Sequence, residues 1–178
     1  MPEPRDPARS FRVKHACGHY ESYPHLVEPE EEARLGTTEK VLAAREQALN
    51  WKESRPCPTC YWDGSARAIL RRLSELGVPL VDLPRFTDAT EKQRWWAHKI
   101  RAEKLQQVEE RFRSIYADIL QAERDPARQE RARFAHRMYG QAIVAVVSTT
   151  AVTYWIDNRA VSGWRLVMNA VPGWAKLP

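Results

Sequence analysis

The stretch Cys57-Pro58-Thr59-Cys60 decides the fold of the N-terminal part, together with Cys17-Gly18-His19 earlier in the chain. These two segments contain all three cysteines of the 178 residues. A Cys-x-x-Cys turn presents two thiolates to one ion, and Cys17 and His19 can supply the other two ligands of a tetrahedral site. The sequence therefore predicts a closed, structural Zn2+ site with four ligands, Cys17, His19, Cys57 and Cys60.

Alternative ligands and an alternative chemistry exist for these residues. His15 or His25 could replace His19 as the imidazole ligand. A Cys-x-x-Cys pair can also be a redox motif, but such motifs lie in a βαβ pattern, which this sequence does not show. Three cysteines, an odd number, argue against a disulfide framework. The N-terminus has no apolar segment typical of a signal peptide, so we expect a reducing, cytoplasmic location.

Around the metal ligands, the pattern predicts a small α+β module stapled by zinc. A short strand is expected over residues 11–20, followed by an irregular stretch to residue 35. Thr38 is the expected N-cap of a helix that continues to about residue 54. A second helix is expected over residues 66–76, where Gly77 would end it.

The rest of the chain predicts a helical module, so the fold class is mainly α. Asp88 and Glu91 resemble a capping box at the start of a long helix ending near residue 123. The next helix begins at Pro126, and a short helix around Trp155 precedes an irregular tail. Prolines bound the extended residues 78–84, so the predicted domains are residues 1–82 and 83–178. Residues 138–156 are uncharged, but polar and β-branched residues interrupt them, and we expect buried helices rather than a membrane span.

Four islands of this sequence resemble one group of small proteins from bacteria, phages and plasmids. The islands are Cys17-Gly18-His19, Cys57-Pro58-Thr59-Cys60, the segment Leu-Pro-Arg-Phe-Thr-Asp-Ala-Thr-Glu-Lys-Gln-Arg-Trp-Trp-Ala-His-Lys-Ile-Arg over residues 83–101, and Thr-Ala-Val-Thr-Tyr-Trp-Ile-Asp-Asn-Arg over residues 150–159. The group pairs a Cys-x-His…Cys-x-x-Cys knuckle with a Leu-Pro-x-Leu-Thr-Gly-Ser-x-Lys-Gln-x-x-Trp-Ala-x-x-Ile-Arg helix and a Trp-Ile-Asp-x-Arg segment. The chain departs from this pattern at Phe86 and at Asp88-Ala89. The resemblance implies an architecture and a mobile-element setting, without a reaction.

Two of these islands carry charged and aromatic residues that could join them. Arg101, Asp157 and Arg159 are predicted to form an ion-pair network that locks two helices together. A binding site for phosphate or for a partner's carboxylate is the alternative for the same residues. Trp96 and Trp155 are expected to be buried beside this network.

The net charge of +5 lies entirely in the C-terminal half. Residues 1–86 contain 13 Lys and Arg and 13 Asp and Glu, whereas residues 87–178 contain 15 Lys and Arg and 10 Asp and Glu. This excess favours either a solvated helix face or contacts with phosphates or a partner. The candidate contacts are Arg94, Lys99, Arg101, Lys104, Arg111, Arg113, Arg128, Arg131 and Arg133.

These patterns favour a zinc-stabilised, non-catalytic adaptor of a mobile genetic element that engages a macromolecular partner. One alternative is a nucleic-acid-binding regulator, and another is an anti-defence inhibitor of a host nuclease complex. A host or mobile-element protein complex is the expected partner, nucleic acid is a second candidate, and no membrane is expected. The sequence has no Gly-rich phosphate loop, His-Glu-x-x-His motif or nucleophile elbow, so an enzyme is the least favoured class.

Overall fold

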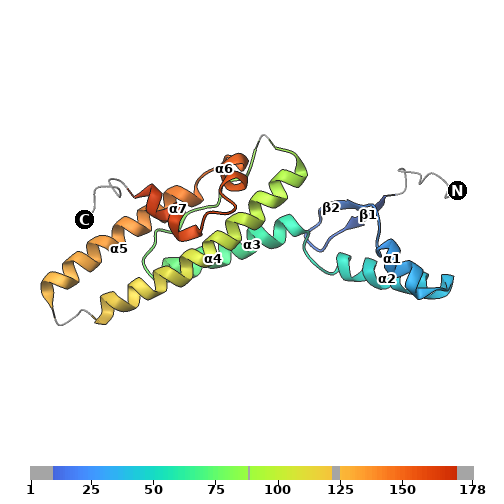
Figure 1. Cartoon of the computed structure of the whole chain (residues 1–178), viewed down its shortest axis with the longest axis horizontal. Coiled ribbons are helices and arrows are strands. Elements are labelled where there is room, and N and C mark those ends of the chain that lie inside the picture. The colour runs from blue at the N-terminus through green and yellow to red at the C-terminus, as the bar shows by residue number, and fades with distance from the viewer. Residues whose placement is uncertain (1–9, 88, 122–124, 172–178) are drawn as a thin grey trace. The chain divides into compact units, whose positions relative to one another are not determined.

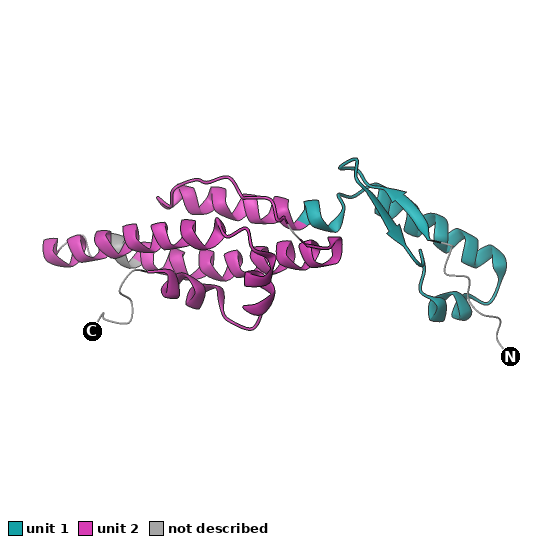
Figure 2. Ribbon diagram, turned by 90° about the horizontal axis from the view of Figure 1, so that it is seen from above, with its two compact units in different colours: residues 1–61 teal, residues 62–178 magenta. Residues whose placement is uncertain are grey.

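The computed structural model describes residues 10–87, 89–121 and 125–171. The chain divides into two compact units, residues 1–61 and residues 62–178 (Figure 2). The fold class is mainly α, with a small sheet in the first unit, as the sequence predicts. The division into units comes earlier in the chain than the predicted boundary after residue 82, which lies inside the second unit.

A β-hairpin and two helices make up most of the first unit (Figure 1). Strands β1 (Phe11–Lys14) and β2 (Tyr20–Tyr23) pair antiparallel, and β1 contacts α2. The region expected to be irregular therefore contains β2 and helix α1 (Pro29–Leu35). Proline at the first position of α1 and three glutamates in its first turn favour a helix start there.

Helix α2 (Thr38–Glu53) confirms the helix predicted over residues 38–54, with a different cap. Thr37, in an extended conformation, is the N-cap residue, and its side chain accepts a hydrogen bond from the backbone N–H of Lys40. Thr38, the predicted cap, is the first helical residue.

The described residues of the second unit form five helices, the first of which begins in the first unit. They are α3 (Pro58–Glu75), α4 (Glu91–Gln121), α5 (Pro126–Val147), α6 (Val152–Asp157) and α7 (Gly163–Ala170). Helices α4, α5 and α7 contact one another, and α6 contacts α4. Helix α7 falls in the tail that the sequence pattern leaves irregular; Ser162 caps it by accepting a hydrogen bond from the backbone N–H of Arg165.

The position of α3 explains why the units divide where they do. Its buried stripe, which includes Ile69, Leu70 and Leu73, belongs to the same core cluster as Leu105 and Phe112 of α4. A helix that shares its apolar face with α4 cannot belong to a separate N-terminal domain, because burying that face is its main source of stability. The extended residues after α3 are also held, since Val78 and Leu83 lie in this cluster.

The helix ends of the second unit rely on local side-chain caps. Thr90 and Gln93 form a reciprocal capping box at the start of α4: the Gln93 N–H donates to Thr90 Oγ1 and the Thr90 N–H donates to Gln93 Oε1. The predicted cap, Asp88, lies outside the described residues. Asp125 caps α5 by accepting from the N–H groups of Ala127 and Arg128, and Pro126 occupies the first turn as predicted.

Trp96 differs from the prediction, because 42% of its surface is exposed. The buried stripe of α4 instead passes through Ala97, Ile100, Arg101 and Leu105, at helical spacings of three and four. Trp96 lies one residue away from that stripe and therefore points to its margin. Among the helices of the described residues, none has the combination of length and apolar character needed to cross a membrane.

Candidate metal centre

A tight turn at the tip of the hairpin places the first two ligands. The His15 N–H donates to His19 O at 2.9 Å, and the Gly18 N–H donates to His15 O at 2.8 Å. Gly18 has a φ of +82°, in the left-handed region where a side chain would be strained. The turn brings Cys17 and His19 to the same side despite their spacing of two residues.

The other two ligands lie at the start of α3. Cys57 immediately precedes the helix, Pro58 is its first residue, and Cys60 lies in the first turn. Proline is favoured at this position because its missing N–H would have no helical partner. The partial positive charge of a helix N-terminus also favours the thiolate form of cysteine, which is the form that ligates metals.

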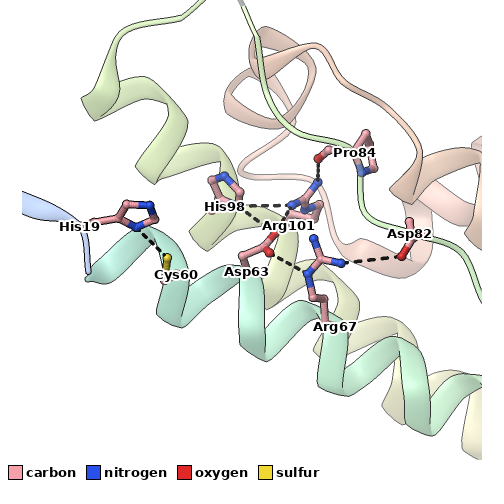
Figure 3. Close-up of polar contacts among 8 residues, drawn as sticks. All are labelled: His19, Cys60, Asp63, Arg67, Asp82, Pro84, His98 and Arg101. Carbon is pink, nitrogen blue, oxygen red and sulfur yellow. Dashed lines mark hydrogen bonds and ion pairs between the residues drawn. The ribbon is translucent and has the colours of Figure 1, made fainter. Parts of the chain in front are cut away.

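The four side chains converge on one point within the first unit. One ligand atom from each of Cys17, His19, Cys57 and Cys60 lies within 4.8 Å of the others. His19 Nδ1 is 3.2 Å from Cys60 Sγ (Figure 3), 3.7 Å from Cys57 Sγ and 3.7 Å from Cys17 Sγ. These four residues form the metal cluster. The sequence prediction of which four side chains come together is confirmed.

The three thiols affect one another's ionisation, and a bound cation would favour the thiolate form of all three. Burial raises the pKa of the Cys17 thiol, but hydrogen bonds from the backbone of Cys57 and His19 outweigh it and lower the pKa to about 6. Burial and then the neighbouring Cys57 thiol raise the pKa of Cys60 to about 12, and burial raises the pKa of Cys57. Three thiolates this close repel one another, so a bound metal ion is what allows all of them to ionise.

The two rival histidines lie outside the metal cluster. His15 is buried, and its ring nitrogens are already engaged: Nδ1 lies 3.3 Å from Arg55 O and Nε2 lies 3.0 Å from the Tyr23 hydroxyl. His15 therefore links the hairpin to the segment before α3 and is not free to bind a metal ion. His25 is exposed and is not one of the four converging residues.

A second polar cluster, in the second unit, is one that sequence reasoning missed. Asp63 of α3 accepts hydrogen bonds from Arg101 at 3.0 Å and from Arg67 at 2.8 Å, and its Oδ1 lies 3.4 Å from His98 Nδ1 (Figure 3). The hydrogen bond with His98 is the main reason that the pKa of Asp63 lies well below its usual range. These residues form the Asp63 network.

Arg101 is the centre of the Asp63 network and is fully buried. It donates to Pro84 O at 3.1 Å, and its guanidinium carbon lies 4.4 Å from the centre of the Phe86 ring. Burial lowers the pKa of Arg101 to about 10, against the raising effect of Asp63. The Asp63 network thus joins α3, α4 and the extended segment between them, which suits a structural role.

The predicted network of Arg101, Asp157 and Arg159 does not form in the described part of the chain. Arg101 pairs with Asp63 instead, and the Arg159 side chain donates to Ile156 O. Trp155 is completely buried, as predicted, and donates to Thr149 O at 3.2 Å. No sequence signal identifies Asp63 as the partner, because it lies 38 residues before Arg101.

The nine basic residues predicted to contact a partner divide by exposure. Arg101 and Lys104 are buried, and the Lys104 ammonium donates to Arg159 O at 2.8 Å. Neither side chain is available to a phosphate. The residues Arg111, Arg113, Arg128, Arg131 and Arg133 are exposed, whereas Arg94 and Lys99 are partly exposed. Arg113 also pairs with Glu109 at 2.8 Å and Arg128 with Asp125 at 3.3 Å, so part of this charge is neutralised within the chain.

Comparisons with protein-family profiles, with curated proteins and with solved structures found no match for this chain.

Proposed function

We propose that this protein is a zinc-stabilised, non-catalytic adaptor that binds a macromolecular partner. The observation that carries the proposal is the convergence of three thiols and one imidazole in the metal cluster. A tetrahedral ion uses all four of these ligands, so no position remains for a water molecule or substrate. Closed sites of this kind stabilise a fold, and a binding protein is the function that such a module supports best.

The donor set and the spacing both favour zinc. Thiolates and imidazole suit Zn2+, which binds them at about 2.3 Å and about 2.0–2.1 Å in a tetrahedron. Such bonds would separate neighbouring ligand atoms by about 3.6 Å, and the distances from His19 Nδ1 to the sulfur atoms are 3.2–3.7 Å. The resemblance to small proteins of bacteria, phages and plasmids supports a mobile genetic element as the setting for the adaptor.

Metal analysis tests the first part of the proposal. Elemental analysis of reduced, freshly purified protein should find about one zinc per chain. Cys57→Ser should lose the metal and the hairpin's order while α4 and α5 stay helical, because metal binding supplies the folding free energy of a small module. Reduced wild-type protein that contains no zinc and still has an ordered hairpin would disprove the proposal.

Partner capture tests the second part. The wild-type chain should retain a defined partner from nuclease-treated lysate of its host, and the Cys57→Ser chain should lose it. A partner retained equally by both chains would locate binding outside the metal module. Release of the partner by nuclease alone would favour nucleic acid as the bridge.

A further inference from the structure

One face of the β-hairpin is open to solvent and differs in chemistry from the other. In the antiparallel register Arg12 lies opposite Ser22, and Lys14 lies opposite Tyr20. These four side chains share one side of the hairpin, because alternate residues of a strand point to the same side of a sheet. All four are exposed. They form the open hairpin face. Val13, on the opposite side, is fully buried.

The open hairpin face combines an aromatic ring with two cations. Tyr20 is 52% exposed, so its ring is accessible to a ligand. The guanidinium carbon of Arg12 lies 4.4 Å from the centre of the Tyr20 ring, and the Lys14 ammonium lies 5.9 Å from it. The Arg12 guanidinium thus lies over one face of the Tyr20 ring, and both cations extend from the surface that carries the ring.

The two cations of the open hairpin face have no carboxylate partner among the described residues. Glu21 is the only acidic residue of the hairpin, residues 11–23, and it lies on the opposite side, bonded to the Tyr23 hydroxyl and 3.2 Å from His15 Nε2. Neither Arg12 nor Lys14 forms an ion pair with any carboxylate of the described residues. Two cations without a carboxylate partner on one face favour an anionic ligand.

We propose that the open hairpin face binds single-stranded nucleic acid, with phosphates at Arg12 and Lys14 and a base stacked against Tyr20. The inference rests on the proposed function, since the metal cluster supports the hairpin, and it adds a nucleic-acid contact to the partner that the adaptor binds. Proteins bind single strands with this combination of side chains. Cationic side chains contact the phosphates of the nucleic acid, and unpaired bases stack on exposed aromatic rings. A duplex keeps its bases stacked, and an acidic peptide would use the cations without the ring.

Fluorescence anisotropy with a labelled oligothymidylate of about 12 nucleotides tests the inference on the full, metal-loaded chain. Tyr20→Ala should weaken binding by about 5- to 150-fold, the range for losing one stacked base, and Tyr20→Phe should retain it. The double variant Arg12→Gln with Lys14→Gln should reduce the slope of log affinity against log salt by about 1.4, from about 0.7 for each phosphate.

A matched control removes the same charge elsewhere. Arg34→Gln with Lys40→Gln, on the exposed surfaces of α1 and α2 in the same unit, should leave the salt slope nearly unchanged. The inference is overturned if this control lowers the slope instead of the hairpin pair. It is overturned equally if Tyr20→Ala binds as well as wild type, or if polyglutamate competes as well as the unlabelled oligonucleotide.

The metal content of every variant separates this inference from the proposed function. Zinc at about one per chain together with no binding to the oligonucleotide would overturn the inference and leave the zinc-stabilised fold standing. A chain without zinc that still binds the oligonucleotide through Tyr20 would contradict the proposed function and retain the binding surface.

Discussion

At the scale of single residues, neighbours decide which of several identical side chains carries a role. His15 and His19 are four residues apart, yet the first is buried and bonded on both nitrogens whereas the second is exposed and faces three sulfur atoms. Arg101 and Arg111 are both on α4, but only Arg101 is enclosed.

We expect His19→Ala to weaken metal binding more than His15→Ala does. His19→Ala removes a ligand, whereas His15→Ala removes only a supporting side chain. Loss of a supporting side chain typically lowers metal affinity by about 10- to 100-fold. Competition with a chromophoric chelator at neutral pH measures both. Weaker binding by His15→Ala than by His19→Ala would show that the imidazole ligand has been assigned to the wrong histidine.

We expect Arg101→Ala to destabilise the second unit by about 3 kcal/mol, because it removes a fully buried guanidinium that donates to both Asp63 and Pro84 O. Arg111→Ala, on the exposed side of the same helix, should change stability by at most about 0.5 kcal/mol. Urea unfolding followed by circular dichroism compares the two. Equal effects would mean that the Asp63 network contributes nothing to the stability of the fold.

The Asp63 network also predicts a dependence on pH. The folded-state pKa of Asp63 is lowered, first by His98 and then by Arg67 and Arg101. Its contribution to stability is therefore complete above the unfolded pKa of about 3.9 and is lost as the pH falls below that value. The stability difference between wild type and Asp63→Asn should shrink between about pH 4 and pH 2. A difference that stays constant over this range would rule out the ionised carboxylate as its source.

At the scale of elements, α7 depends on a close approach to α4. A Cβ atom at Gly163 would lie 2.2 Å from the backbone carbonyl oxygen of Lys104, and the Gly163 N–H donates to Gln107 Oε1 at 2.6 Å. Only glycine allows this separation, because the atom that a side chain would meet is backbone and cannot move aside.

Gly163→Ala should therefore destabilise the protein by about 2–3 kcal/mol, the cost of forcing packed elements apart. Gly64→Ala is the matched control, since Gly64 lies in α3 with nothing within 4 Å of the added methyl group. It should stabilise the helix by up to about 1 kcal/mol. Thermal unfolding of both variants checks the expected opposite signs; a harmless Gly163→Ala would mean that α7 does not pack closely on α4 in solution.

At the scale of the whole molecule, α3 belongs by its core to the second unit. A fragment of residues 62–178 should fold cooperatively, because it keeps Leu70 and Leu73 against α4. A fragment of residues 83–178 should lose cooperative unfolding, since it exposes the part of the core that α3 covers. Circular dichroism melts of both fragments test this, and equally sharp transitions would support the boundary predicted from the prolines.

The sequence by itself determined the features that depend on neighbours along the chain. The spacing of Cys17, His19, Cys57 and Cys60 predicts a metal site because few arrangements other than coordination bring three thiols and an imidazole together. The approximate extents of α2, α4 and α5 follow from helix start and stop signals, which are also local properties.

Only the tertiary structure decided the features that depend on partners distant in sequence. It assigned α3 to the second unit, paired Arg101 with Asp63 and left Trp96 at the margin of the core. Local patterns predict which face of a helix is apolar, but several helices can cover that face. The choice among them depends on how whole surfaces pack together, and that information is spread over the chain rather than contained in any one segment.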